Sequence, residues 1–108
     1  MRGKKTPLPD NALEAVVFDL ERATKVLTAL AHPSRYQMIC LLREKEWPSL
    51  SLTSAVGLTP GAGSQHLVIL KAAGLVETRR AAQTIYYSLK ANEISPILDI
   101  LASSSDSR

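Results

Sequence analysis

Cysteine is nearly absent from this chain of 108 residues, in which Cys40 is the only one. A single cysteine excludes a disulfide within the chain and is typical of a reducing compartment. No apolar run approaches the ~20 residues that a membrane-spanning helix needs. The basic segment 1–9 also lacks the apolar stretch of a signal peptide. We therefore expect a cytoplasmic protein with no membrane partner.

Histidine is also scarce, with only His32 and His66. Two histidines, one cysteine and no acidic cluster at ligand spacing predict no metal site within one subunit. The sequence has no Ser/His/Asp or Cys/His pattern for nucleophilic catalysis and no glycine-rich phosphate loop. We expect neither an enzyme nor a bound cofactor.

The composition is that of an ordinary globular protein, with 45% hydrophobic and 21% charged residues. The net charge of +3 permits a polyanionic partner without requiring one. The length predicts one domain. We place it at 10–102, between a loose N-terminal tail at 1–9 and a frayed, serine-rich tail at 103–108.

An amphipathic helix is predicted at each end of this domain. Asn11 and Glu14 have the spacing of a capping box, and apolar residues then recur at helical spacing as far as Leu30. The last helix is expected to begin near Asn92 or at Ser95. Each apolar stripe exceeds what one small core can bury, which predicts a homodimer joined through both helices. The predicted interface residues are Leu13, Val16, Val17, Leu20, Leu27, Ile94, Ile97, Leu98 and Leu101.

Shorter elements are predicted between these two helices. Helices are expected at 33–45, 50–56 and 60–73, and strands at 76–80 and 84–89. Gly57 and Gly74 are predicted to cap two helices at their C-terminal ends, while Thr59 followed by Pro60 is a strong start signal. The link 81–83 is short enough for a hairpin. The fold class is therefore mainly α with a small β-hairpin.

One face of the helix at 60–73 predicts contact with DNA. Its inward face is expected to carry Leu67 and Leu70, while the opposite face carries small and hydrogen-bonding residues. Such a helix fits the major groove of DNA, and a hairpin with arginines at its tip can contact the flanking phosphates. The predicted DNA-binding residues are Thr59, Gly61, Ser64, Gln65, Val68, Lys71, Arg79, Arg80, Gln83 and Thr84.

Several of these residues have a purely structural alternative. Arg79 and Arg80 could be an ordinary exposed strand end, and Thr59 a helix cap with or without a phosphate contact. Val68 could contact a thymine methyl group or be a surface valine. We expect His66 to be packed and hydrogen-bonded rather than a ligand, and His32 to be a cap or junction residue.

Four motifs in this order resemble the ArsR/SmtB family of winged-helix bacterial repressors over about 12–102. They are LAHPSR at 30–35, SQHL at 64–67, AGLV at 73–76 and RRAAQTIYY at 79–87. The last is most similar to the metal-independent branch of regulators such as NolR, HlyU and BigR. The resemblance implies a winged helix-turn-helix homodimer that binds an imperfect palindrome upstream of the genes it controls.

The chain departs from this family where metals and thiols are sensed. The segment at 50–54 lacks the cysteine pair of metal-binding members, and the last helix carries Asp99 without a histidine. Cys40 is similar to a cysteine that pairs, in thiol-sensing members, with a second one on the last helix, which is missing here. Cys40 therefore stays a candidate redox sensor, with a small packed side chain as the alternative. Gly61 and Gly63 stand where the family usually has bulkier residues. Two explanations are open: a phosphate or base approaches these positions closely, or the local sequence preference has shifted.

We predict a dimeric transcriptional regulator that binds a double-stranded DNA operator sequence-specifically as a repressor. The helix at 60–73 would enter the major groove, and the hairpin would contact the flanking backbone or minor groove. The alternatives are a protein-interaction module or an anti-silencing regulator on the same fold. A third is a repressor that responds through Cys40 to an oxidant or a reactive sulfur species.

Overall fold

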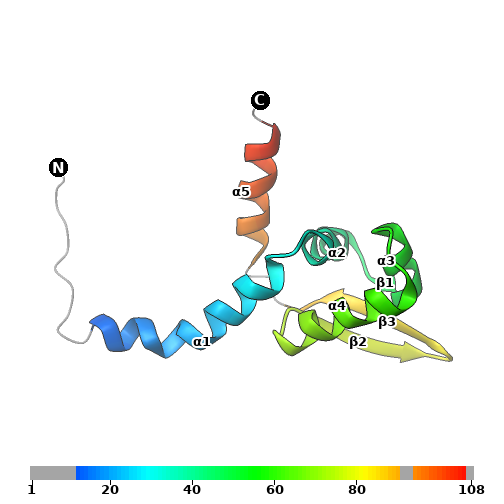
Figure 1. Ribbon diagram of the computed structural model, residues 1–108, viewed down its shortest axis with the longest axis horizontal. Helices are drawn as coiled ribbons and strands as arrows, with labels where there is room; N and C mark the ends of the chain where they lie inside the picture. The colour runs from blue at the N-terminus through cyan, green and yellow to red at the C-terminus, as the bar shows by residue number, and fades with distance from the viewer. Residues whose placement is uncertain (1–11, 91–93, 107–108) are drawn as a thin grey trace.

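The computed structural model describes residues 12–90 and 94–106, and the side-chain surroundings of 20–90 and 94–103 (Figure 1). The described helices are α1 (Ala12–Leu30), α2 (Pro33–Glu44), α3 (Ser49–Ala55), α4 (Pro60–Ala72) and α5 (Ser95–Asp106). The strands are β1 (Trp47–Pro48), β2 (Val76–Ala81) and β3 (Thr84–Leu89). The predicted tail at 1–9, the cap at Asn11 and the side chains of Leu13, Val16 and Val17 lie outside the described part.

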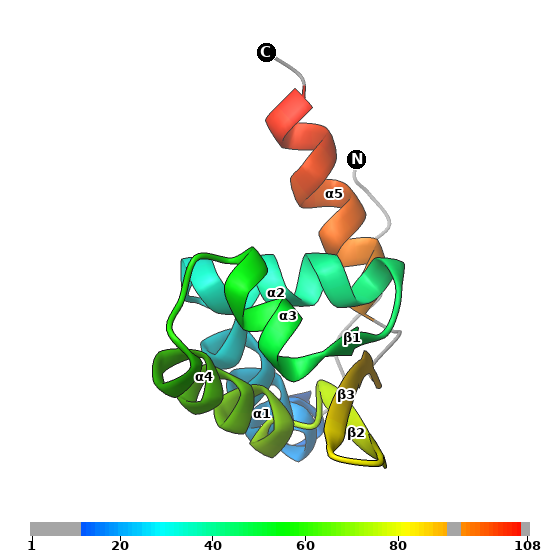
Figure 2. The ribbon, with the colours of Figure 1, turned by 90° about the vertical axis from the view of Figure 1, so that its right-hand side faces the viewer.

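The core lies between α2, α3, α4 and the sheet, where apolar side chains from distant parts of the chain meet. Its fully buried large side chains are Met38, Ile39, Leu52, Leu67, Leu70, Leu75 and Leu98. Val26 and Ala29 of α1 join this cluster. The first half of α1 and most of α5 extend away from the body (Figures 1 and 2). This shape leaves two helices free to contact another molecule.

Glycine caps end α3 and α4 as the sequence predicted. Gly57 and Gly74 have φ angles of 76° and 78°, which side chains with a Cβ rarely adopt. At each end, paired hydrogen bonds form a Schellman motif. For α4, the N–H of Gly74 donates to the carbonyl of Lys71 at 3.0 Å, and the N–H of Leu75 to that of Leu70 at 3.1 Å. These sharp stops fix the turn between α3 and α4 and the step from α4 into β2.

The sheet has three strands in the order β1-β3-β2, all antiparallel. The sequence predicted only the hairpin of β2 and β3, which we call the wing; β1 was missed because its two residues include Pro48 and show no alternation. The turn of the wing is Ala82-Gln83, so Arg80 pairs with Ile85 and Arg79 with Tyr86. Ile85 is 36% exposed and lies next to the turn.

The observed α5 corrects two predictions. It continues to Asp106, so 103–106 are helical rather than a frayed tail. Ile94 and Leu98, predicted at a dimer interface, are 4% and 1% exposed because they pack into the core of their own protomer. Ile97, Ile100 and Leu101 remain exposed on α5, and Leu20 and Leu27 on α1. Ile100 was not among the predicted residues.

Candidate nucleic-acid interface

The two faces of α4 separate as predicted. Leu67 and Leu70 are buried, whereas Gly61, Ser64 and Gln65 are exposed. The Oγ1 atom of Thr59 accepts a hydrogen bond from the N–H of Ala62 at 3.3 Å, which confirms its role as a helix cap. Val68 and Lys71 extend the exposed face by two turns. An uncharged, hydrogen-bonding surface therefore leads to a single lysine at the end of α4.

Gly63 allows α3 and α4 to cross closely. It is buried, and a Cβ atom at this position would collide with the side chain of Thr53, itself buried on α3. The explanation that a phosphate or base approaches Gly63 is therefore wrong, because a protein side chain occupies that space. Gly61 has no such neighbour within 4 Å. The close crossing holds α4 against α3, with its polar face toward solvent.

The pleat of the wing sends its two arginines to opposite faces. Side chains alternate along a strand, and directly paired residues lie on the same face. Arg80 pairs with Ile85, and Ile85 faces α4, where it lines a hollow of about 260 Å³ together with Ser64. Arg80 thus lies on the side of the wing that faces α4, and Arg79 lies on the other side.

Arg79 is held within the protein on this outer face. Its Nε and one terminal nitrogen each donate to a carboxylate oxygen of Glu46 at 2.8 Å. Its guanidinium also lies 4.4 Å from the ring centre of Tyr86, the residue paired with it across the wing. This ion pair lowers the pKa of Glu46 and raises that of Arg79. The contacts fasten the wing to the segment that precedes β1.

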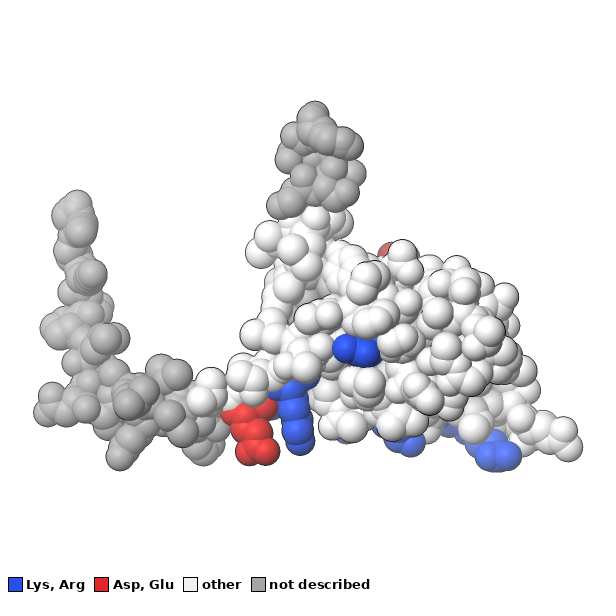
Figure 3. All heavy atoms as spheres, viewed as in Figure 1, with Lys and Arg blue, Asp and Glu red and all other residues white. Residues whose placement is uncertain are grey.

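A second contact joins the wing to α4. The Nζ atom of Lys71 donates to the Oγ1 atom of Thr78 at 3.4 Å, and Thr78 lies on the same face of the wing as Arg80. Basic side chains follow the lower edge of the molecule in Figure 3, beneath the region of α4 and the wing. The arrangement combines a polar helix face, an adjacent arginine and a concave surface between them, which suits a DNA duplex better than a small substrate.

This geometry can be compared with that of known proteins. The family model described as bacterial regulatory protein, arsR family, matches residues 32–78. The nodulation protein NolR of Rhizobium meliloti is 42% identical over 96 residues, which cover 89% of this chain and 75% of NolR. The transcriptional activator HlyU of Vibrio cholerae is 38% identical over 80 residues, 74% of each chain. The chain belongs to the arsR family.

A solved structure extends the match to nearly the whole chain. It is the homodimeric winged helix-turn-helix DNA-binding domain of Mb0332 from Mycobacterium bovis, with a TM-score of 0.74 and 27% identity, covering 98% of this chain and 91% of that one. The resemblance to the branch of NolR and HlyU is confirmed, as is the winged helix-turn-helix fold. The chain is a transcriptional regulator of this family rather than an enzyme, as the names of its relatives indicate.

The sensing positions known from the arsR family are occupied differently here. Asp99 on α5 forms an ion pair with Arg43 of α2. Within the described residues, no group of three or more His, Cys, Asp or Glu side chains could hold a metal ion. Within the same residues, no helix is long and apolar enough to span a bilayer. The ion pair of Asp99 with Arg43 links the last helix to the body.

Cys40 lies partly buried beside Tyr36, in the wall of a hollow of about 520 Å³ between α2 and the end of α3. A hydrogen bond with Cys40 is the largest cause of the raised pKa of the Tyr36 hydroxyl. Arg43, which lies near Cys40 in the sequence, is engaged by Asp99. A sensor role for Cys40 stays a prediction.

The two histidines join α1, α2 and α4. His32 caps α2, with its Nδ1 atom accepting from the N–H of Ser34 at 3.1 Å, and its ring centre lies 4.4 Å from that of His66. Arg35 donates to the Nδ1 atom of His66 at 3.1 Å and to the carbonyl oxygen of Ala29 at 2.6 Å. Burial, and then the electrostatic influence of His32 and Arg35, lowers the pKa of His66. Both predictions, a capping His32 and a packed His66, are confirmed.

Sequence reasoning missed the partners that position the site. Glu46 and Tyr86 hold Arg79, and Arg35 holds His66. Tyr86 could have been found from the hairpin, since a turn at residues 82–83 places it opposite Arg79. Glu46 had no local signal, because it lies 33 residues from Arg79 in the sequence.

Proposed function

We propose that this protein is a dimeric, sequence-specific DNA-binding repressor, with α4 in the major groove and the wing on the flanking backbone or minor groove. The observation that carries this proposal is the exposed polar face of α4 next to an arginine on the same side of the wing. The confirmed family and fold support it, since the Mycobacterium bovis neighbour is a homodimeric DNA-binding domain.

Base reading is assigned to Ser64 and Gln65. Both are exposed on α4, and a glutamine side chain can pair with the two major-groove atoms of adenine that accept and donate hydrogen bonds. Val68, which is 63% exposed, would touch a thymine methyl group. Phosphate contacts are assigned to Arg80 and to the N-terminus of α4, where the helix dipole attracts anions. Arg79 positions the wing through Glu46.

Dimerisation supports this assignment through an apolar surface that one protomer leaves uncovered. Its members are Leu20, Leu27, Ile97, Ile100 and Leu101, all more than 40% exposed. They lie on α1 and α5, away from the exposed face of α4. Two copies joined through these helices would direct both α4 helices toward one duplex. The two half-sites would then form an inverted repeat whose centres lie about one helical turn apart.

Repression is the expected outcome, since a dimer bound over a promoter excludes polymerase. HlyU, however, is named a transcriptional activator. An anti-silencing regulator displaces another protein from the same DNA and uses the same interface, so the DNA contacts proposed here hold for both. Transcription from the promoter with purified polymerase, measured with and without the protein, distinguishes them, because only a repressor lowers transcription when no other DNA-binding protein is present.

Substitution of Gln65 tests the base-reading role. The change Gln65→Ala should relax preference at one position of each half-site by about 1–3 kcal/mol and leave binding to random duplex unchanged. The matched control is Gln37→Ala, since Gln37 is an exposed glutamine on α2. Fluorescence anisotropy with single-base operator variants measures the preference. An unchanged preference at every position would contradict the placement of α4 in the groove.

A further inference from the structure

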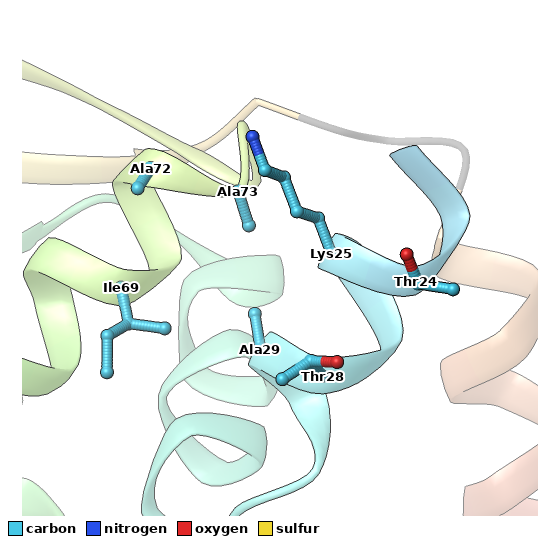
Figure 4. A pocket seen from close by; sticks show the side chains of 7 residues that line it. All are labelled: Thr24, Lys25, Thr28, Ala29, Ile69, Ala72 and Ala73. Carbon is cyan, nitrogen blue, oxygen red and sulfur yellow. The ribbon is translucent and has the colours of Figure 1, made fainter. Parts of the chain in front are cut away.

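A hollow of about 320 Å³ lies between α1 and α4 (Figure 4). The α1 helix supplies Thr24, Lys25, Thr28 and Ala29, and α4 supplies Ile69, Ala72 and Ala73. Its walls are mostly apolar. Three of the seven lining residues are alanines, which leave space where larger side chains would close the gap. Hollows of about 300–1,000 Å³ take small organic ligands, so this one has room for a small ligand.

One cationic side chain, that of Lys25, lines this hollow, and it is exposed to solvent. Figure 4 shows the side chain of Lys25 extending from α1 toward Ala73, with Ile69 on the facing helix. In the described part of the chain, Lys25 has no ion pair. Glu21, one turn earlier on α1, lines a neighbouring hollow that shares Lys25, Ala72 and Ala73. The hydroxyl of Thr24 donates to the carbonyl oxygens of Leu20 and Glu21. Lys25 is therefore the group that would select the charge of a ligand.

We propose that this hollow binds a small apolar carboxylic acid, whose carboxylate pairs with the ammonium of Lys25. The body of the acid would lie against Ile69, Ala29 and Ala73, where its burial supplies the favourable free energy. An acid fits better than an amine, because an amine would place a second cation beside Lys25. A flat ring system fits a space bounded by two helices and the methyl groups of alanines.

The position of the hollow gives such a ligand a regulatory effect. The α1 helix carries Leu20 and Leu27 of the proposed dimer surface, while α4 carries the proposed base-reading residues. A ligand between the two helices changes the angle between them, and hence the separation of the two α4 helices in a dimer. It shifts DNA affinity only if it binds the two arrangements unequally. This consequence rests on the proposed function; the binding of the acid does not.

Binding is tested first without DNA, by titrating the full chain with naphthoate and following amide and methyl signals by NMR. Saturable shifts should centre on Ile69, Ala72 and Ala73. Naphthyl methanol is the neutral control. The change Lys25→Gln should weaken naphthoate roughly three- to fivefold, as expected for a partly exposed ion pair, and leave the alcohol unaffected. The matched control is Lys45→Gln, since the ammonium of Lys45 lies 4.7 Å from the ring centre of Trp47, outside the hollow.

A second variant tests the space itself. Ala73→Leu fills the hollow and should abolish binding of both compounds, while its retained amide spectrum shows that it folds. If millimolar naphthoate causes no NMR shifts at Ile69, Ala72 and Ala73, the proposal is overturned. This holds whether the hollow has no affinity for the acid or a second copy of the chain covers it. Equal weakening of acid and alcohol by Lys25→Gln overturns the role of Lys25. Operator affinity is then measured with and without naphthoate: bound acid with unchanged affinity overturns only the regulatory effect.

Discussion

Replacement of each wing arginine by alanine separates the two roles assigned to them. Arg80 lies on the face of the wing that carries Ile85, where we propose a phosphate contact, whereas Arg79 lies on the other face. Arg80→Ala should remove a phosphate contact from each protomer. Arg79→Ala should instead release Glu46 and Tyr86 and loosen the wing. The two variants have the same formal charge, so net charge cannot account for a difference between them.

The expected size of the effect follows from counterion release. Each phosphate contact contributes roughly 0.9 to the slope of log K against log salt. A dimer loses two such contacts with Arg80→Ala, so the slope should fall by roughly 1.8. The affinity should fall about 60-fold at 0.1 M salt and about ninefold at 0.3 M. The ion pair of Arg79 is half in solvent, with side chains 56% and 33% exposed, so its loss should weaken binding only modestly.

Anisotropy titrations of one duplex at several salt concentrations measure both quantities. The slope for Arg79→Ala should stay near that of the wild type, and Glu46→Gln should reproduce its affinity because it breaks the same ion pair. A slope lowered by Arg79→Ala as much as by Arg80→Ala would refute the division of roles. An unchanged slope for Arg80→Ala would refute the docking of the wing.

Three further predictions concern stability, pH and assembly. Gly63→Ala should destabilise the fold by about 1–3 kcal/mol, because the added methyl group overpacks the crossing of α3 and α4; Gly61→Ala, with open space around it, should not, and denaturant melts compare them. The pKa of His66 lies below its ordinary 6.5 in the folded state, so the unfolded chain binds the proton more readily. Stability should therefore be full above about pH 6.5 and fall below it, with a loss that is smaller in His66→Gln; an equal loss in both would contradict this. Ile97→Asp should shift the sedimentation coefficient to that of a monomer, whereas Leu50→Asp, at an exposed apolar residue of α3, should not; a monomeric wild type at micromolar concentration would contradict the dimer.

Much of the fold could be predicted because its boundaries carry strong local signals. Gly57 and Gly74 mark helix ends through a backbone conformation that other residues avoid, and Thr59 caps α4 with its own hydroxyl. Leu67 and Leu70 could be placed in the core because the spacing of apolar residues along a helix decides which of its faces is apolar. These features depend on residues close together in the sequence.

The remaining features depend on distant partners. The predicted stripe on α5 joined Ile94 and Leu98 with Ile97, and only the packing of α5 on the body shows which two are buried within the protomer. No local pattern pairs Arg79 with Glu46, since the pairing depends on how the wing meets the segment that precedes β1. For Gly63, the replacement of a bulkier residue was visible in the sequence, but the reason for it is a contact with α3 that no local pattern reveals.

Selection from a library of random DNA duplexes tests the central claim most directly, because it requires no knowledge of the operator. The wild-type protein should enrich an inverted repeat with half-sites about one helical turn apart, and Gln65→Ala should enrich the same repeat with one position relaxed. Failure to enrich any sequence, or enrichment of a single site without symmetry, would contradict a dimeric reader that inserts two α4 helices into one duplex.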